Sequence, residues 1–274
     1  MTAVAVGLVG ALGLAIGSFL NVVVYRVPAG LSVVRPASAC PQCGAAIRSR
    51  DNVPVLSWLL LRGRCRDCRT AISARYPAVE ALTGLAFVLV GLWAVPGILA
   101  AGSPLAVASG AVALLGWLYL AAISVALAAI DLDTRRLPDA IVLPSYLVAG
   151  VLFTAAALLG GETERLLPMG VGALASVAFY LVLALIYPGG MGMGDVKLAG
   201  VLGLALGYAG WSALIVGVAS AFVLGGLVGL VVLAVRRARE RAIPFGPWMF
   251  AGAWIGIVAG AAVAAGYLEL AGLA

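Results

Sequence analysis

The sequence contains no histidine among its 274 residues and only one lysine, Lys197. Without histidine, the chain cannot use Ser-His nucleophilic catalysis or the HExxH arrangement of zinc proteases. A Ser-Lys dyad would have to use Lys197. If the chain is a hydrolase, carboxylates are nearly the only catalysts left, and it has eleven of them.

Charged residues are also scarce. They make up 10% of the chain, against about a quarter in ordinary soluble domains, while hydrophobic residues make up 64%. Such a chain cannot cover its surface with polar groups, so we expect lipid to surround it. Leu, Val, Ala and Gly dominate the apolar stretches without strict alternation. This pattern predicts membrane-spanning helices rather than a transmembrane barrel.

The hydropathy pattern predicts an all-α integral membrane protein with about eight transmembrane helices, since a span needs about 20 apolar residues. The first apolar run is longer than the core of a signal peptide and lacks a basic flank before it, so we interpret it as a retained helix. The sixth run is short, and Gly207 and Gly210 are expected at the turn that follows it. The expected spans are residues 3–24, 78–100, 105–130, 140–159, 167–187, 196–209, 211–235 and 248–273.

The basic residues set the expected orientation. The net charge is +6, but the arginines flank apolar spans instead of forming a nucleic-acid-binding surface. Nine lie from Arg26 to Arg75, and four cluster at Arg236, Arg237, Arg239 and Arg241. With the N-terminus outside, 16 of the 17 lysines and arginines lie on the inner side and only Arg165 lies outside. The positive-inside rule therefore predicts this topology, with no nucleic-acid partner.

All four cysteines lie in one polar loop, residues 25–77, which we expect to form a small cytoplasmic module. Cys40 and Cys43 form one C-x2-C pair, and Cys65 and Cys68 form the second. Two such pairs are typical of a structural zinc site with four thiolate ligands, and Gly44 favours the tight turn that this needs. Disulfides and metal-free thiols are the alternatives, although structural disulfides are rare in a reducing cytoplasm.

Two acids occur at the inner ends of expected spans. Asp131 directly follows the run 105–130, and Asp195 closes the glycine-rich stretch 189–195 before the run 196–209. Both can lie at the same depth, and ionisable groups there are functional candidates. Two neighbouring carboxylates would share a proton, which supplies a general base for water and a general acid for the leaving amine.

A structural role for these acids stays open on the residues alone. Asp131 and Asp133 could merely cap and solvate a loop beside Arg135 and Arg136. We expect Asp133 and Asp139 to be loop residues, with Asp139 capping the helix that begins at Ala140. Glu80 is a weaker candidate for a polar role inside the helices.

Several motifs follow one another in a specific order. They are residues 17–26, 40–43, 51–58, 62–68, 73–77 with Glu80, Asp131 with 137–139, 192–198 and 244–247. With this ordered set, which includes Gly192-Met-Gly-Asp195, the sequence resembles the type IV prepilin peptidases over most of its length.

The resemblance implies a bifunctional enzyme of the inner membrane. It would cleave the basic leader of type IV prepilins or pseudopilins at the cytoplasmic side, with Asp131 and Asp195 as catalytic aspartates. It would then N-methylate the new amino terminus with S-adenosylmethionine, whose binding site the sequence does not locate. The corresponding domains are the first helix 1–24, the zinc module 25–77, which is linked to methylation, and the peptidase core 78–274.

Two functions from other classes compete with this interpretation. A transporter or channel could use Asp131 and Asp195 for ions or protons, and a membrane scaffold could dock a partner through the cysteine module. Release of a leader peptide would distinguish the protease from both. The oligomeric state cannot be read from the sequence.

Overall fold

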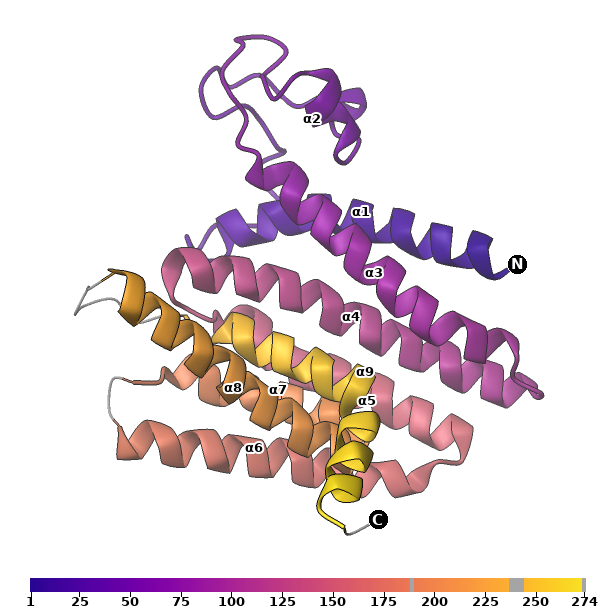
Figure 1. The fold of residues 1–274 in the computed structure, drawn as a ribbon. Coiled ribbons are helices and arrows are strands. Elements are labelled where there is room, and N and C mark those ends of the chain that lie inside the picture. The colour runs from indigo at the N-terminus through magenta and orange to yellow at the C-terminus, as the bar shows by residue number, and fades with distance from the viewer. Residues whose placement is uncertain (188–189, 237–243, 273–274) are drawn as a thin grey trace. The chain divides into compact units, whose positions relative to one another are not determined.

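A computed structural model describes residues 1–187, 190–236 and 244–272. The chain is all-α within these residues (Figure 1). Two short 3-10 helices, η1 (Ser49–Asp51) and η2 (Thr163–Arg165), accompany the α-helices. The α-helices are α1 (Thr2–Arg26), α2 (Leu56–Leu60), α3 (Arg75–Leu99), α4 (Pro104–Thr134), α5 (Asp139–Gly160), α6 (Leu166–Ile186), α7 (Met193–Ala209), α8 (Trp211–Arg236) and α9 (Gly246–Leu270).

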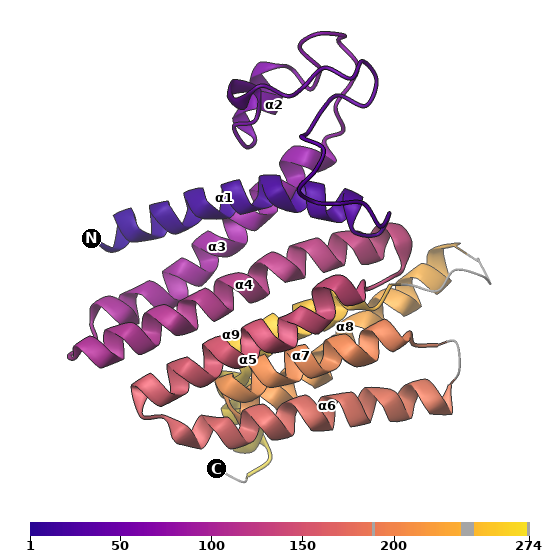
Figure 2. The same cartoon turned by 180° about the vertical axis from the view of Figure 1, so that it is seen from behind.

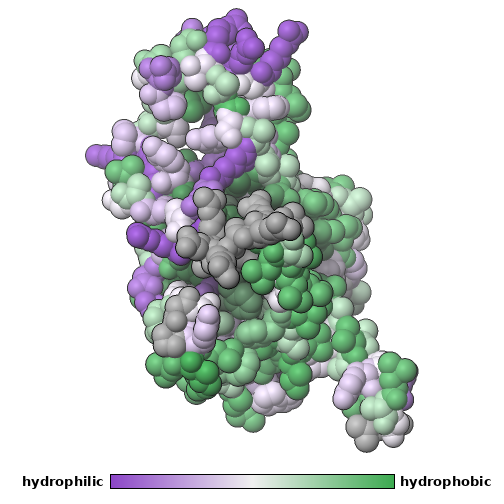
Figure 3. Space-filling model, turned by 60° about the vertical axis from the view of Figure 1, so that its left-hand side comes forward, coloured by the Kyte–Doolittle hydropathy of each residue, from purple (hydrophilic) through white to green (hydrophobic). Residues whose placement is uncertain are grey.

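Each of the eight expected spans corresponds to a helix. Seven helices within the described residues are long and apolar enough to cross a membrane, which makes this a multi-pass membrane protein. The remaining helix, α7, which corresponds to the sixth expected span, has only 17 residues. Hydrophobic residues cover much of the helical surface in Figure 3, whereas hydrophilic residues gather on the cysteine-containing segment at the top.

The first compact unit comprises residues 1–129. Within it, α1 and α3 pack closely because glycines remove side chains from their contact. A Cβ on Gly13 would lie 2.6 Å from the Cβ of Phe87, and one on Gly17 would lie 2.7 Å from the Cα of Glu80. Small residues permit such close approach of helix backbones in lipid.

The second compact unit comprises residues 130–274 and is built around α7. The helices α5, α6, α8 and α9 all contact α7 (Figures 1 and 2), and eleven of its 17 residues are buried. Gly203 packs against the backbone of Gly172 on α6, and Gly207 packs against that of Pro168. This burial explains how a short helix is kept in the centre of its unit.

The structure corrects two boundaries beside the candidate carboxylates. The helix α4 continues to Thr134, so Asp131 and Asp133 are helical and do not lie in a loop. It ends where Arg135 takes a left-handed φ of 53°. Asp139 is the first residue of α5, whose N-cap is Pro138, so the expectation that Asp139 caps this helix is wrong.

Parts of three expectations lie outside the described residues. They are Gly189 in the glycine-rich stretch, Arg237, Arg239 and Arg241 in the basic cluster, and Leu273 in the last expected span.

Candidate functional site

Asp131 lies buried in the last turn of α4, with only 4% of its surface exposed. The backbone N–H of Gly246 donates a hydrogen bond of 3.0 Å to its Oδ2 atom. Gly246 is the first residue of α9, where backbone N–H groups have no acceptor within the helix. The start of α9 therefore holds the carboxylate of Asp131.

Asp195 is the third residue of α7 and is held by the same kind of contact. Its Oδ2 atom accepts a 3.1 Å hydrogen bond from the backbone N–H of Gly192, the N-cap of that helix. The side chain thereby turns back over the beginning of α7, where the helix dipole favours negative charge. Gly192 and Gly194 keep this approach free of large side chains.

The two carboxylates lie near each other within the second unit. They lie close enough for the charge of Asp131 to act on Asp195. Leu137 joins the two segments that hold them: a Cβ on Gly194 would lie 3.0 Å from the Cβ of Leu137, and one on Gly246 would lie 3.4 Å from its Cδ2. This arrangement can bring a base and an acid to one water molecule.

The other acids that the sequence singled out have different surroundings. Asp139 forms an ion pair with Lys197, whose Nζ lies 2.8 Å from Oδ2 of the carboxylate. Glu80 accepts a 2.7 Å hydrogen bond from the backbone N–H of Val55. Asp133 is exposed on the last turn of α4. Lys197 pairs with Asp139 here, and no Ser-Lys contact is found within the part of the chain that the structure describes.

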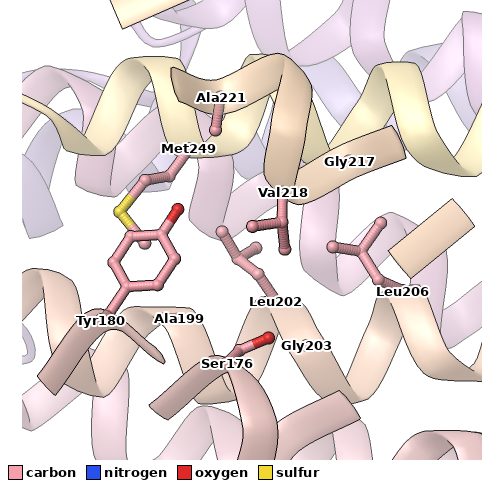
Figure 4. Close-up of a pocket in the computed structure, with 10 residues that line it drawn as sticks. All are labelled: Ser176, Tyr180, Ala199, Leu202, Gly203, Leu206, Gly217, Val218, Ala221 and Met249. Carbon is pink, nitrogen blue, oxygen red and sulfur yellow. The ribbon is translucent and has the colours of Figure 1, made fainter. Parts of the chain in front are cut away.

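A small cavity lies among α6, α7, α8 and α9 (Figure 4). Ala199, one helical turn after Asp195, is one of its lining residues, and the cavity volume of about 10 Å³ approaches the space that one water molecule needs. Two hydroxyl-bearing side chains of α6, Ser176 and Tyr180, line its otherwise apolar wall. Tyr180 is 2% exposed and lies close enough to Asp195 for electrostatic interaction.

Sequence reasoning missed the contributions of Gly246 and Tyr180. The Gly246–Pro247 pair at the start of an apolar run signals a helix N-terminus, but nothing local shows that this N-terminus faces Asp131. Tyr180 stands in an apolar run like any core aromatic, and its ring packs 5.3 Å from that of Phe222.

The four cysteines are brought together as the sequence predicts. Their sulfur atoms all lie within 4.8 Å of one another, and the Sγ atoms of Cys40 and Cys68 are 3.7 Å apart. Four thiolates around a tetrahedral zinc ion at about 2.3 Å would be separated by about 3.8 Å. The donor set and its spacing therefore fit one metal ion bound by Cys40, Cys43, Cys65 and Cys68.

The two C-x2-C turns have the same backbone design. The N–H of Gly44 bonds to the carbonyl of Cys40 at 2.9 Å, and the N–H of Arg69 bonds to that of Cys65 at 3.1 Å. The residue after each pair has a left-handed φ, 71° at Gly44 and 62° at Arg69. The glycine makes the first turn predictable from the sequence, whereas the arginine gives no sign of the second.

Backbone groups also favour the thiolate form at this site. Hydrogen bonds from the backbone N–H groups of Cys43 and Gln42 lower the pKa of Cys40 to about 6, whereas hydrogen bonds with the other cysteine side chains, Cys68 above all, raise the pKa of Cys43 to about 12. A thiol that ionises near neutral pH binds metal readily, because the thiolate is the ligand.

Comparison with known proteins agrees with the ordered motifs. Residues 11–94 match the bacterial peptidase A24 N-terminal domain, and residues 118–230 match the type IV leader peptidase family. The chain is 36% identical to a prepilin leader peptidase/N-methyltransferase of Aeromonas salmonicida, over 93% of this chain and 91% of the relative. It is 38% identical to one of Dickeya chrysanthemi, over 90% of each. A relative from Neisseria gonorrhoeae shares 36% identity over 92% of this chain and 89% of its own. No solved structure matches.

Proposed function

Because this chain belongs to the prepilin leader peptidase/N-methyltransferase family, we propose that it removes the leader of a type IV prepilin or pseudopilin with Asp131 and Asp195. The observation that carries the proposal is the position of the two carboxylates. Each is held by a backbone N–H at the start of a helix, and their charges interact.

The cleavage step follows from this pair. One carboxylate, in its ionised form, takes a proton from a water molecule, and the resulting hydroxide attacks the scissile carbonyl. The other, in its protonated form, gives its proton to the leaving amine as the C–N bond breaks. The N–H groups of Gly246 and Gly192 fix the carboxylate oxygens during these transfers, so little reorganisation is required.

The second activity acts on the new amino terminus. S-adenosylmethionine would be the methyl donor: the amine would lose a proton and accept the methyl group, and S-adenosylhomocysteine would leave. We assign methylation to the cysteine module, residues 25–77, and peptide cleavage to the core 78–274. In support of this division, Asp131, Asp195 and both of their backbone donors lie in residues 130–274, apart from the cysteines in sequence and in compact unit.

We assign a structural zinc ion to the module. Four thiolate ligands leave no open coordination position for water, so the ion would stabilise the fold of the module instead of activating a nucleophile. The segment is also too short to bury a core of its own. Zinc would therefore contribute much of its folding free energy.

The distribution of charge supports an inner-membrane location with the N-terminus outside and the cysteine module in the cytoplasm. The ends of α1 and α3 that flank the module, at Arg26 and Arg75, are basic. In this orientation the carboxylates meet the substrate where its leader enters the membrane.

Mass spectrometry of a co-expressed prepilin tests the proposal directly. The wild-type chain should yield a pilin that has lost its leader and carries one methyl group on the new amino terminus. An intact prepilin in cells that contain the folded enzyme would contradict the assignment.

A further inference from the structure

The short helix α2 exposes three leucines in the polar cysteine module. Leu56, Leu59 and Leu60 are 57%, 56% and 82% exposed. Single exposed leucines are common on protein surfaces, but three on one turn form a contiguous apolar patch. Another side chain of α2 attaches the helix to the module: Trp58 donates its Nε1–H to the carbonyl of Ile72 at 3.0 Å.

A partly buried hydrogen bond sets the position of α2 along the membrane-spanning helices. The backbone N–H of Val55, directly before α2, donates to Oε2 of Glu80 on α3 at 2.7 Å. Glu80 is only 9% exposed, and its backbone packs against Gly17 of α1. Gly17 precedes the end of α1, Arg26, by about 13 Å at 1.5 Å per residue. The start of α2 is therefore level with a point well inside α1.

The ribbon views agree with this position. Figures 1 and 2 show the module beside the C-terminal half of α1, and it does not extend α1 lengthwise. Because α1 spans the bilayer, a segment beside its C-terminal half faces the headgroup region of one leaflet. This position would bring the exposed leucines to lipid.

The charge of the cysteine module indicates which kind of lipid it would contact. Residues 25–77 contain nine arginines and only two acids, Asp51 and Asp67. Both acids are paired, Asp51 with Arg66 and Asp67 with Arg48. Arg62 and Arg64, directly after α2, are exposed and form no ion pair within the described residues. Guanidinium groups at this depth bind phosphate well, since each offers several N–H donors.

We propose that α2 is an interfacial helix that docks on anionic phospholipid. Leu56, Leu59 and Leu60 contact the acyl chains near the headgroups, and Arg62 and Arg64 bind lipid phosphates. Amphipathic segments with basic flanks bind anionic membranes in this way. A basic leader peptide is an unsuitable occupant, because the arginines repel it.

Hydrogen–deuterium exchange of the full chain in nanodiscs tests this. Amides of residues 57–64 should exchange about tenfold more slowly in discs that contain phosphatidylglycerol than in discs of phosphatidylcholine alone. Leu60→Ser and the double variant Arg62→Gln/Arg64→Gln should remove this difference. Ile47→Ser, which alters an exposed apolar residue near the first cysteine pair, should leave it unchanged.

Glu80 provides a second test. Glu80→Ala should abolish the lipid-dependent protection of residues 57–64, whereas Glu80→Gln, which keeps an acceptor oxygen, should retain it. Zinc content and exchange at residues 65–70 would show that the module remains folded. Equal exchange in both lipids would overturn the proposal. Protection that appears only when prepilin is added would also overturn it, because the leucines would then contact the substrate. Protection that appears only as protein concentration rises would overturn it as well, because the leucines would then contact a second copy of the chain.

Discussion

The backbone N–H of Gly246 lies 3.0 Å from Oδ2 of Asp131, a residue 115 positions earlier in the chain. A Cβ on Gly246 would lie 2.8 Å from the same oxygen. A side chain at this position would therefore displace the carboxylate of Asp131 or the start of α9, and either movement would disturb this hydrogen bond.

Gly246→Ala should reduce leader cleavage by about 100-fold, because a displacement of about 1 Å at a reacting group can cost that much. The rate of cleavage of a purified prepilin measures the effect. Gly226→Ala is the matched control, since a Cβ there meets nothing within 4 Å. Full activity of Gly246→Ala would show that Asp131 does not depend on this contact.

Asp131→Asn and Asp195→Asn should each reduce cleavage by a factor on the order of 10³ or more, because water then lacks either its base or the acid that serves the leaving amine. Asp133→Asn should have a much smaller effect, since Asp133 is exposed. Immunoblots of prepilin processing, with membrane insertion as the control for folding, measure all three. Loss of cleavage in Asp133→Asn together with an active Asp131→Asn would mean that the role belongs to Asp133 instead.

The sequence predicts the helices better than the site. Apolar runs in lipid must satisfy their backbone polar groups internally, so the eight runs could only become helices. The end of α4 could not be predicted from composition, because most of the residues directly after Ile130 are polar. The helix nevertheless continues until Arg135 adopts a left-handed φ.

The partners of the site were harder still to predict. The local spacing of the four cysteines predicts that they form a cluster. By contrast, Asp131 acquires its donor from Gly246 only when α9 has packed in the same unit. Asp139 and Glu80 appear as free acids in the sequence, yet both are engaged, with Lys197 and the Val55 amide.

The purified chain should contain about one zinc ion, and replacement of Cys40, Cys43, Cys65 and Cys68 by serine should remove it. Elemental analysis measures the metal. Methylation should fall more than cleavage, because the carboxylates belong to the other compact unit. Metal-free protein with the four cysteines in disulfides would refute the zinc assignment.

The two C-x2-C turns should respond oppositely to substitution. Gly44→Ala should weaken zinc retention, because a left-handed backbone costs about 1–2 kcal/mol for a residue with a Cβ. A Cβ at Gly44 meets nothing within 4 Å, so steric clash does not contribute. Arg69→Gly should strengthen retention by relieving the same strain at a φ of 62°. Competition with a chelator measures both, and the same sign of change in the two variants would contradict this explanation.

Gly203→Ala should destabilise the second unit without releasing zinc from the first. A Cβ at Gly203 would overlap the carbonyl oxygen of Gly172, so α6 and α7 would have to separate. Overpacking of this kind typically costs about 1–3 kcal/mol, and it would act on the helix that carries Asp195.

Thermal unfolding in detergent, followed together with zinc release and prepilin cleavage, measures this effect. Cleavage should be lost at a lower temperature than in the wild type, while the temperature of zinc release stays the same. Gly170→Ala on α6 is the control, because a Cβ there meets nothing within 4 Å and alanine favours the helix. If Gly203→Ala lowered both temperatures equally, residues 1–129 and 130–274 would unfold as one cooperative body. The cysteine module and the carboxylates would then unfold together, although they belong to different compact units.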